Sequence, residues 1–198
     1  MLSLAWIPGA STDDLSKRVL TRMLGQKTSE DSVCMVRSSR VMKSLPNNAF
    51  RAGVGIVLVN GAGKVLALER VDKTGAWQMP QGGLRKDEDP LGAARRELRE
   101  ETEIDPALVE PVSEYPKWLA YELPPDRWSG KYGRGQVQKW FLFRFTGRDD
   151  DIHLEDVEKP EFSSWRWMEL SALAEETALF RRPIYRALAA EFGAHLRG

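Results

Sequence analysis

A helix that begins shortly after a glycine pair is the feature that most constrains the fold of this chain. Asp89 can accept a hydrogen bond as the N-cap residue, and Pro90 suits the first helical position. The pattern then predicts a helix that ends at about Thr102. Its apolar residues form one stripe, made of Leu91, Ala94 and Leu98. The helix can pack this stripe against a second layer of the fold and present its other residues to a cleft.

Three glutamates share another face of this helix. Glu97, Glu100 and Glu101 are spaced i, i+3 and i+4, so their carboxylates lie together. One interpretation is a solvated face on which neighbouring arginines neutralise the glutamates. The other is a metal site, because the preceding Gly82-Gly83 pair would let backbone carbonyls approach an ion closely. Oxygen ligands without a nearby His or Cys suit Mg²⁺ or Mn²⁺.

Strand patterns and helical patterns alternate after residue 50. Asn60-Gly61 predicts a hairpin between two apolar segments. Residues 170–196 have a helical pattern that is interrupted at Pro183. Strands mixed with two or three helices predict an α/β or α+β sandwich. The strand-like segments are residues 54–58, 64–68, 77–81, 114–123, 138–146 and 162–168.

Composition changes at about residue 48. The first 48 residues contain few aromatics and carry seven basic against four acidic side chains, a net charge of +3. An amphipathic helix is expected from Ser11 to Gly25, followed by a polar linker. We therefore expect a flexible N-terminal extension at residues 1–48 and one domain at residues 49–198.

Charge and cysteine content limit the partners of this chain. Lys+Arg and Asp+Glu both total 29, so a nucleic-acid ligand would need a local basic patch. The single Cys34 excludes an internal disulfide and a cysteine metal cluster, and it suits a reducing compartment. No apolar run approaches the roughly 18 residues that span a membrane. We expect a cytoplasmic protein that binds neither DNA nor a membrane, and the oligomeric state stays open.

The spacing around the glutamate helix resembles the signature of the Nudix hydrolase family. The matching positions are Gly82, Glu88, Arg96, Glu97, Leu98, Glu100, Glu101 and Ile104. The resemblance implies an α/β/α sandwich with a mixed β-sheet between helices, and cleavage of phosphoanhydride bonds. It further implies that Glu97, Glu100 and Glu101, with a carbonyl at Gly82, bind two or three Mg²⁺ or Mn²⁺ ions. Glu103 departs from the family pattern, which has a helix-ending glycine there, so we expect a lengthened or strained helix end.

Other stretches are similar to bacterial RNA pyrophosphohydrolases and to asymmetrical dinucleoside polyphosphate hydrolases within that family. They include WQMPQGG at residues 77–83 and GQVQKWF at residues 135–141, and the likeness extends over about residues 50–192. It implies a nucleotide polyphosphate or 5′-triphosphorylated RNA as substrate. The residues that it implies as substrate contacts are Arg51, Tyr121, Gln136, Lys139 and Phe180. Each has a structural alternative, as a rim charge, an edge polar group or a packed aromatic ring.

The resemblance also matches Glu161, in the sequence PEF, to a loop carboxylate that helps to bind metal and deprotonate water. Glu155 and Glu158 in the same acidic loop are the alternatives, together with the helix glutamates. Attack by that water would release pyrophosphate or split a dinucleoside tetraphosphate, and it needs no covalent intermediate.

Two other functions stay compatible with the sequence. One is a Nudix enzyme that cleaves nucleotide sugars or nucleoside triphosphates. The other is a non-catalytic Nudix module that senses nucleotides, which would keep the fold and lose the helix carboxylates. The carboxylates are present here, which favours an enzyme.

Overall fold

The computed structural model describes residues 49–129, 133–154 and 160–197. The helix expected at residues 11–25 and the alternative bases Glu155 and Glu158 lie outside the described residues. Within the described part of the chain, no helix is long and apolar enough to cross a membrane.

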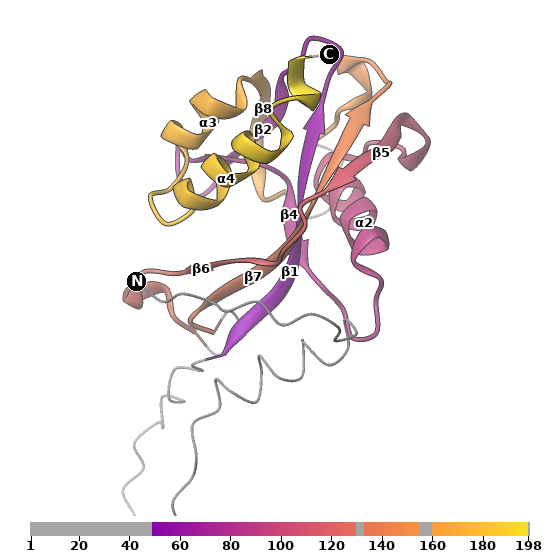
Figure 1. Ribbon diagram of the computed structural model, residues 1–198. Helices are drawn as coiled ribbons and strands as arrows, with labels where there is room; N and C mark the ends of the chain where they lie inside the picture. Colours follow the sequence, from indigo (N-terminus) through magenta and orange to yellow (C-terminus); the bar gives the residue numbers. More distant parts are fainter. Residues whose placement is uncertain (1–48, 130–132, 155–159, 198) are drawn as a thin grey trace, which may run out of the picture. The chain divides into compact units, whose positions relative to one another are not determined.

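A β-sheet lies between helices, with α2 on one face and α3 and α4 on the other (Figure 1). The strands are β1 (Phe50–Val59), β2 (Val65–Arg70), β3 (Trp77–Gln78), β4 (Gln81–Gly83), β5 (Val109–Glu114), β6 (Leu119–Glu122), β7 (Gly135–Phe145) and β8 (Phe162–Met168). The helices are α2 (Pro90–Thr102), α3 (Leu170–Glu176) and α4 (Arg182–Phe192). Short 3-10 helices occur at η1 (Pro106–Leu108), η2 (Pro125–Arg127), η3 (Asp149–Asp151) and η4 (His195–Arg197).

Strand β1 lies at the centre of the sheet, whose order is β3-β2-β1-β7-β5. It pairs in parallel with β7, from Phe50 opposite Gly135 to Val59 opposite Arg144. The other pairings are antiparallel, so the sheet is mixed, as predicted. β4 pairs with the first half of β1, which places the glycine pair beside the central strand.

The predicted hairpin joins β1 to β2. The Asn60 side-chain oxygen accepts hydrogen bonds from the backbone N–H groups of Ala62 and Lys64, both at 3.0 Å. Because these bonds hold the turn closed, Val59 pairs with Val65 directly beyond it.

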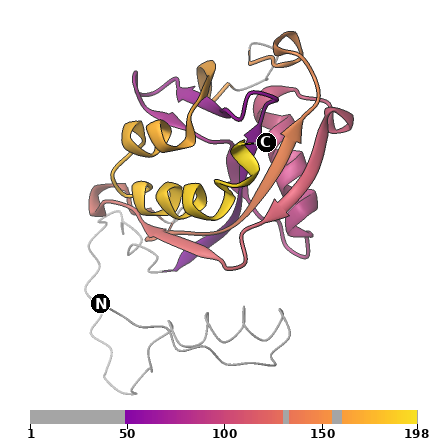
Figure 2. The ribbon, with the colours of Figure 1, turned by 45° about the horizontal axis from the view of Figure 1, so that its top comes forward.

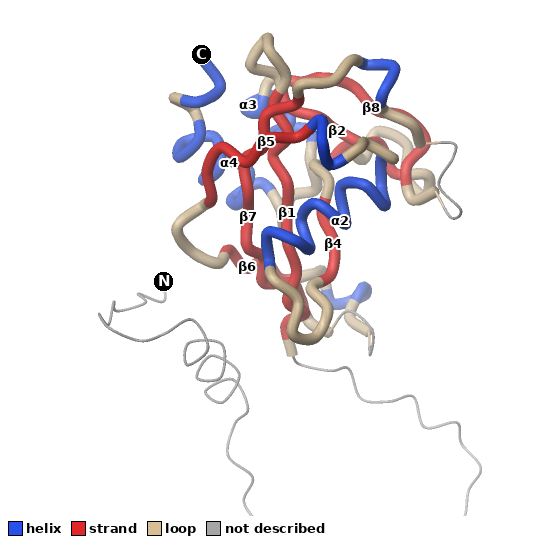
Figure 3. Tube along the Cα trace, turned by 90° about the vertical axis from the view of Figure 1, so that its right-hand side faces the viewer, coloured by secondary structure: helices blue, strands red, loops and turns tan. Residues whose placement is uncertain are grey.

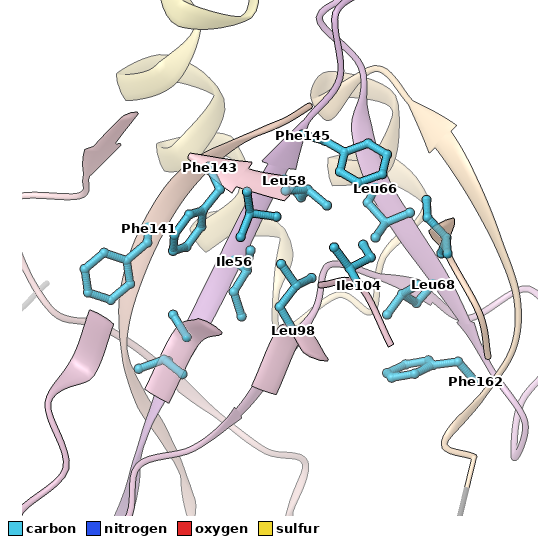
Figure 4. Close-up of a cluster of buried hydrophobic side chains, with 14 of the residues drawn as sticks. Ile56, Leu58, Leu66, Leu68, Leu98, Ile104, Phe141, Phe143, Phe145 and Phe162 are labelled. Carbon is cyan, nitrogen blue, oxygen red and sulfur yellow. The ribbon is translucent and has the colours of Figure 1, made fainter. Parts of the chain in front are cut away.

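Two hydrophobic cores cover the two faces of the sheet. Strand β7 contributes to both, because its side chains alternate between the faces, as the sequence pattern predicts. Phe141, Phe143 and Phe145 pack on the α2 side with Leu98 and Ile104 (Figure 4). The other core packs under α3 and α4, which lie across the sheet in Figure 2, whereas Figure 3 shows α2 on the opposite face. Its largest buried side chains are Trp140, Tyr185 and Phe192.

Helix α2 begins and ends where the sequence predicts. The Asp89 carboxylate accepts a hydrogen bond from the Gly92 N–H at 2.8 Å, with Pro90 in the first turn. Glu103 follows the helix with φ 55° and ψ 7°, and its N–H donates to the Arg99 carbonyl at 2.8 Å. The replacement of the family's glycine by Glu103 therefore does not lengthen the helix. The expected strain lies in the backbone of Glu103, which adopts the left-handed conformation.

Two predicted elements differ from the structure. The strand expected over residues 114–123 is the end of β5 and the whole of β6, separated by residues 115–118. That break contains Pro116, which has no backbone N–H for a sheet. Pro183 lies in the first turn of α4, where proline is tolerated, and the helical interruption precedes it.

Candidate active site

A cleft of about 1120 Å³ opens beside the glycine pair and the polar face of α2. Its other walls come from β1, from the ends of β2 and β6, and from the segments before β8 and before α4. Nine of the sequence-predicted site residues line it: Arg51, Gly82, Glu97, Glu100, Glu101, Tyr121, Gln136, Glu161 and Phe180. The fold thus brings together residues that are up to 129 positions apart in the sequence.

The glycine pair lets two charged side chains lie directly against the backbone. A Cβ atom at Gly82 would overlap the carboxylate of Glu97, and one at Gly83 would overlap the guanidinium of Arg51. A side chain at either position would therefore have to displace the Glu97 carboxylate or the Arg51 guanidinium from its place. The Gly82 carbonyl oxygen itself lies against Gly53 of β1, so its role as a metal ligand stays a prediction.

Two carboxylates crowd together at the base of this cleft. The Glu97 side chain is 14% exposed, and burial raises its pKa, although a hydrogen bond from Arg96 opposes the shift. Burial also raises the pKa of Glu101 well above its usual range, and the negative charge of Glu97 raises it further. The Gln81 N–H donates to Glu101 Oε2 at 3.1 Å, which fixes this carboxylate at the start of β4. A cation between the two groups would relieve both shifts.

Arg96 connects the loop before α2 to the polar face of the helix. Its guanidinium donates to both Glu88 oxygens at 2.7 and 2.8 Å and to the Gly83 carbonyl at 3.0 Å. These bonds from Arg96 lower the pKa of Glu88 to about 2. Arg96 also donates to Glu97 at 2.7 Å and to Glu100 at 3.1 Å. This geometry agrees with the implied positioning role of Arg96 and Glu88.

The neutralised-face interpretation applies to Glu100. Its side chain is 49% exposed and accepts hydrogen bonds from Arg96 and, at 3.0 Å, from Arg85. The described residues contain no group of three or more His, Cys, Asp or Glu side chains arranged to hold a metal ion.

The donor set at Glu97 and Glu101 nevertheless fits a divalent cation. Within the described residues, Glu101 accepts its hydrogen bond from a backbone N–H and none from a cationic side chain. Two crowded carboxylates with raised pKa values and oxygen donors alone are the chemistry that Mg²⁺ or Mn²⁺ would stabilise.

The formal charge of the cleft supports the same conclusion. Among the described residues that line it, six carboxylates face four arginines, a net charge of −2. A polyphosphate would be repelled by this balance, whereas bound divalent cations would reverse it. The carboxylates belong to Asp72, Glu97, Glu100, Glu101, Asp126 and Glu161, and the arginines are Arg51, Arg70, Arg127 and Arg181.

Aromatic rings and an arginine form another wall of the cleft. The Tyr121 and Phe180 rings lie 5.3 Å apart between centroids, tilted by 31°. The Arg181 guanidinium lies over both, 4.9 Å from the Phe180 centroid and 5.5 Å from that of Tyr121. Gln136 lines the cleft too. Tyr121 is 5% exposed and belongs to the core under α3 and α4, so the half-buried Phe180 ring and the Arg181 guanidinium are the flat groups of this wall that can stack with a nucleobase.

Lys139 requires a correction, because the structure does not bring it into the cleft. Its ammonium donates to the Glu114 carboxylate at 3.0 Å and to the Tyr115 carbonyl at 2.8 Å. The side chain is 12% exposed and lies toward the β5 edge of the sheet. Lys139 directly precedes Trp140 in β7, so the two side chains point to opposite faces of the sheet. The strand pattern predicts this alternation, but it does not show which face meets a substrate.

Glu161 extends into the cleft from the segment before β8. Its side chain is 67% exposed, and its carboxylate lies 3.8 Å from the Arg70 guanidinium. Its backbone carbonyl accepts a hydrogen bond from the Val71 N–H at 3.0 Å, which ties this segment to the end of β2. After burial and Glu97, the charge of Glu161 also contributes to the raised pKa of Glu101. The two carboxylates are therefore within electrostatic reach of each other.

Sequence reasoning missed several side chains of the cleft, among them Arg70, Arg127 and Trp128. Arg70 at the end of β2 donates to Asp72 at 2.6 Å besides lying near Glu161. Arg127 and Trp128 line the cleft after β6. The only available signal was an aromatic residue beside an arginine in PPDRWSG, and nothing in that pattern points to a cleft.

The NUDIX domain profile matches residues 49–188 of this chain. The chain belongs to the Nudix family. An RNA pyrophosphohydrolase of Roseobacter denitrificans is 50% identical over 152 residues, which are 74% of this chain and 94% of that protein. Nudix hydrolase 26, chloroplastic, of Arabidopsis thaliana is 40% identical over 171 residues, 81% of this chain and 78% of that protein. The crystal structure of a C. elegans Ap4A hydrolase binary complex has a TM-score of 0.55 at 21% identity and covers 73% of this chain and 98% of that one. The predicted Nudix fold and hydrolase class are confirmed.

Proposed function

We propose that this Nudix hydrolase acts on 5′-polyphosphorylated nucleotides, namely 5′-triphosphorylated RNA ends or dinucleoside polyphosphates. The observation that carries the proposal is the pair of crowded carboxylates, Glu97 and Glu101, in a cleft whose other wall is the Tyr121–Phe180–Arg181 stack. The first group suits cations that hold phosphates, and the second suits a nucleobase. A polyphosphate attached to a base requires both.

Glu97, Glu100 and Glu101 would hold two or three Mg²⁺ or Mn²⁺ ions, with the Gly82 carbonyl as a further donor. When bound, such ions neutralise phosphate oxygens and lower the pKa of a coordinated water. Glu100 would exchange its contacts with Arg85 and Arg96 for this role. Arg96 remains tied to Glu88 and Gly83, so the loop and the helix stay connected during that exchange.

The remaining cleft residues would bind and orient the substrate. Arg51 lies against Gly83 beside Glu97, where its guanidinium can donate to phosphate oxygens. A base stacked on Phe180, against which the Tyr121 ring packs, would set the direction of the polyphosphate toward the carboxylates. Gln136 can contribute a polar contact, although its Oε1 already accepts a hydrogen bond from Gln138 Nε2 at 2.9 Å.

Glu161 would accept the proton of the attacking water. It is exposed to the cleft, and its segment is fixed to β2 through Val71, so its carboxylate stays close to Glu101. Transfer of that proton converts water into the nucleophile, and attack on phosphorus releases pyrophosphate and an RNA 5′-monophosphate. The curated relative named above as RNA pyrophosphohydrolase supports this choice of substrate at 50% identity.

The test compares 5′-triphosphorylated RNA, diadenosine tetraphosphate and ADP-ribose at equal concentration with Mg²⁺. We expect one of the first two to be cleaved at least about tenfold more efficiently than ADP-ribose, roughly 1.4 kcal/mol in transition-state binding. Glu101→Gln should reduce turnover by about 10²-fold or more, and Glu161→Ala should lower kcat by about 10²- to 10⁴-fold.

Glu110→Gln is the matched control, because Glu110 is an exposed glutamate of β5 that does not line the cleft. It should keep wild-type turnover, and EDTA should abolish turnover in every variant. Equal cleavage of ADP-ribose would contradict the substrate assignment. Full activity of Glu101→Gln, or activity in EDTA, would contradict the metal site.

A further inference from the structure

Trp128 presents an indole ring to the cleft at a place separate from the Tyr121–Phe180 pair. It follows the 3-10 helix η2 and lines the cleft together with Leu123 and Arg127. Its indole Nε1–H donates to the Leu123 carbonyl at 2.8 Å. Because this bond ties the ring back to the end of β6, the orientation of the ring is fixed before any ligand binds.

An arginine supports the same ring. The Arg134 guanidinium lies 5.4 Å from the Trp128 centroid, within the range of a cation–π contact. Arg134 is itself held by Glu122, whose carboxylate accepts two hydrogen bonds at 2.5 and 3.1 Å. Leu123 therefore holds the edge of the ring through its carbonyl, and the Arg134 guanidinium, which Glu122 holds in place, lies over one face.

The two aromatic surfaces lie next to each other along one strand and its continuation. Tyr121 belongs to β6, and Leu123, which accepts the Trp128 hydrogen bond, follows two residues later. Two residues of extended chain cover about 7 Å. Trp128 and Phe180 line the same cleft, so a ligand with two neighbouring bases would meet an aromatic surface for each, and the proposed function places one base at Phe180.

We propose that Trp128 is a second stacking surface, which binds the nucleobase that follows or precedes the base held at Tyr121 and Phe180 in an RNA 5′ end. The inference rests on the proposed function for the place of the first base. Arg127, exposed beside Trp128, lies where it can pair with the phosphodiester between the two bases. A mononucleotide would leave this surface empty.

The alternative is that Trp128 only closes the loop after β6. The two roles differ in one measurable respect, because a structural side chain affects ligands with one base and with two bases equally. A stacking surface affects only the second base, and stacking contributes about 5- to 150-fold in affinity, the equivalent of about 1–3 kcal/mol.

The experiment measures binding of AMP and of the 5′-monophosphorylated dinucleotide pApA by calorimetry in Mg²⁺, for the full-length protein. Neither ligand contains a phosphoanhydride bond, so the result does not depend on hydrolysis, and failure of the proposed function would appear separately in the cleavage assay. We expect the wild type to bind pApA at least about fivefold more tightly than AMP. Trp128→Ala should remove this gain and leave AMP affinity unchanged, whereas Trp128→Phe should retain part of it.

Trp118→Ala provides the matched control, because Trp118 is a 41% exposed tryptophan that does not line the cleft. It should bind both ligands as the wild type does. The inference is overturned if Trp128→Ala keeps the preference for pApA, or if its affinities for AMP and pApA fall together. Equal binding of the two ligands by the wild type would overturn it as well. If Trp128→Ala does not fold, Trp128→Phe and Trp128→Leu decide, since only the aromatic replacement should keep the preference.

Discussion

Replacing Glu103 with glycine should stabilise the protein, although most substitutions destabilise. Glu103 is exposed and ends α2 in the left-handed conformation, at φ 55°. That conformation costs a residue with a Cβ roughly 1–2 kcal/mol. Glycine avoids this cost, but it loses more conformational freedom on folding, which offsets the gain by about 0.5–1 kcal/mol. The difference predicts a stabilisation of about 0.5–1 kcal/mol for Glu103→Gly.

Thermal unfolding followed by calorimetry can resolve this gain. A domain of about 150 residues shifts its Tm by about 2–4 °C per kcal/mol, so we expect an increase of about 1–4 °C. Turnover should stay at the wild-type level, because Glu103 does not line the cleft that holds the carboxylates. The hydrogen bond from residue 103 to the Arg99 carbonyl uses the backbone and should persist.

Two companion variants separate backbone strain from the loss of a charge. Glu103→Ala removes the carboxylate but keeps the Cβ, so it should bring no gain in Tm. Asp87→Gly should bring a similar gain, because Asp87 has φ 60° in the loop before α2. If Glu103→Ala stabilises as much as Glu103→Gly, the side-chain charge and not the left-handed backbone is responsible, and the argument fails.

The remaining predictions concern the glycine pair and the anchoring of the loop that carries it. Gly82→Ala should lower turnover at least about tenfold with unchanged circular dichroism, because the new methyl group displaces the Glu97 carboxylate. Gly61→Ala is the control and should keep wild-type turnover, because a Cβ atom at Gly61 meets nothing within 4 Å. Tyr185→Phe should cost about 1–3 kcal/mol in urea unfolding, because the buried Met79 N–H loses the hydroxyl that accepts it at 2.8 Å. Burial raises the pKa of Tyr185 from 10.0 to about 12, so the folded state keeps the hydroxyl protonated at pH values where the unfolded state ionises it. The free energy of unfolding of the wild type should therefore fall between pH 10 and 12, and Tyr185→Phe should lack this decrease.

The parts of the fold that depend on neighbouring residues could be predicted from the sequence. Helix α2 is an example, because its cap at Asp89 and its apolar stripe are local features. The alternation along β7 is another, since the period of a strand fixes which side chains share a face. The parallel pairing of Phe50 with Gly135 joins strands 85 residues apart, and no local pattern encodes it.

The same limit explains which site residues the sequence could identify. Residues on one helix face, such as Glu97 and Glu101, are related by helix geometry alone. Lys139 appeared as a cation beside apolar residues, but its partner Glu114 lies 25 residues earlier on an adjacent strand. Arg70 and Trp128 enter the cleft only because β2 and η2 border it, so their local sequence gives no sign of it.

Each interpretation of the glutamate helix draws support from a different residue. Glu100 is half exposed and bonded to two arginines, which is how a solvated, neutralised face behaves. Glu101, one position later, is turned toward the cleft and bonded to a backbone N–H, and burial raises its pKa. Helix geometry separates consecutive residues by about 100°, so one can be neutralised by arginines at the rim while the other faces the base of the cleft. A count of charges on the helix therefore favours neither interpretation. The burial and hydrogen-bond partners of each carboxylate support the proposed cation site at Glu97 and Glu101, and they describe the arginine contacts that Glu100 would exchange on binding a cation.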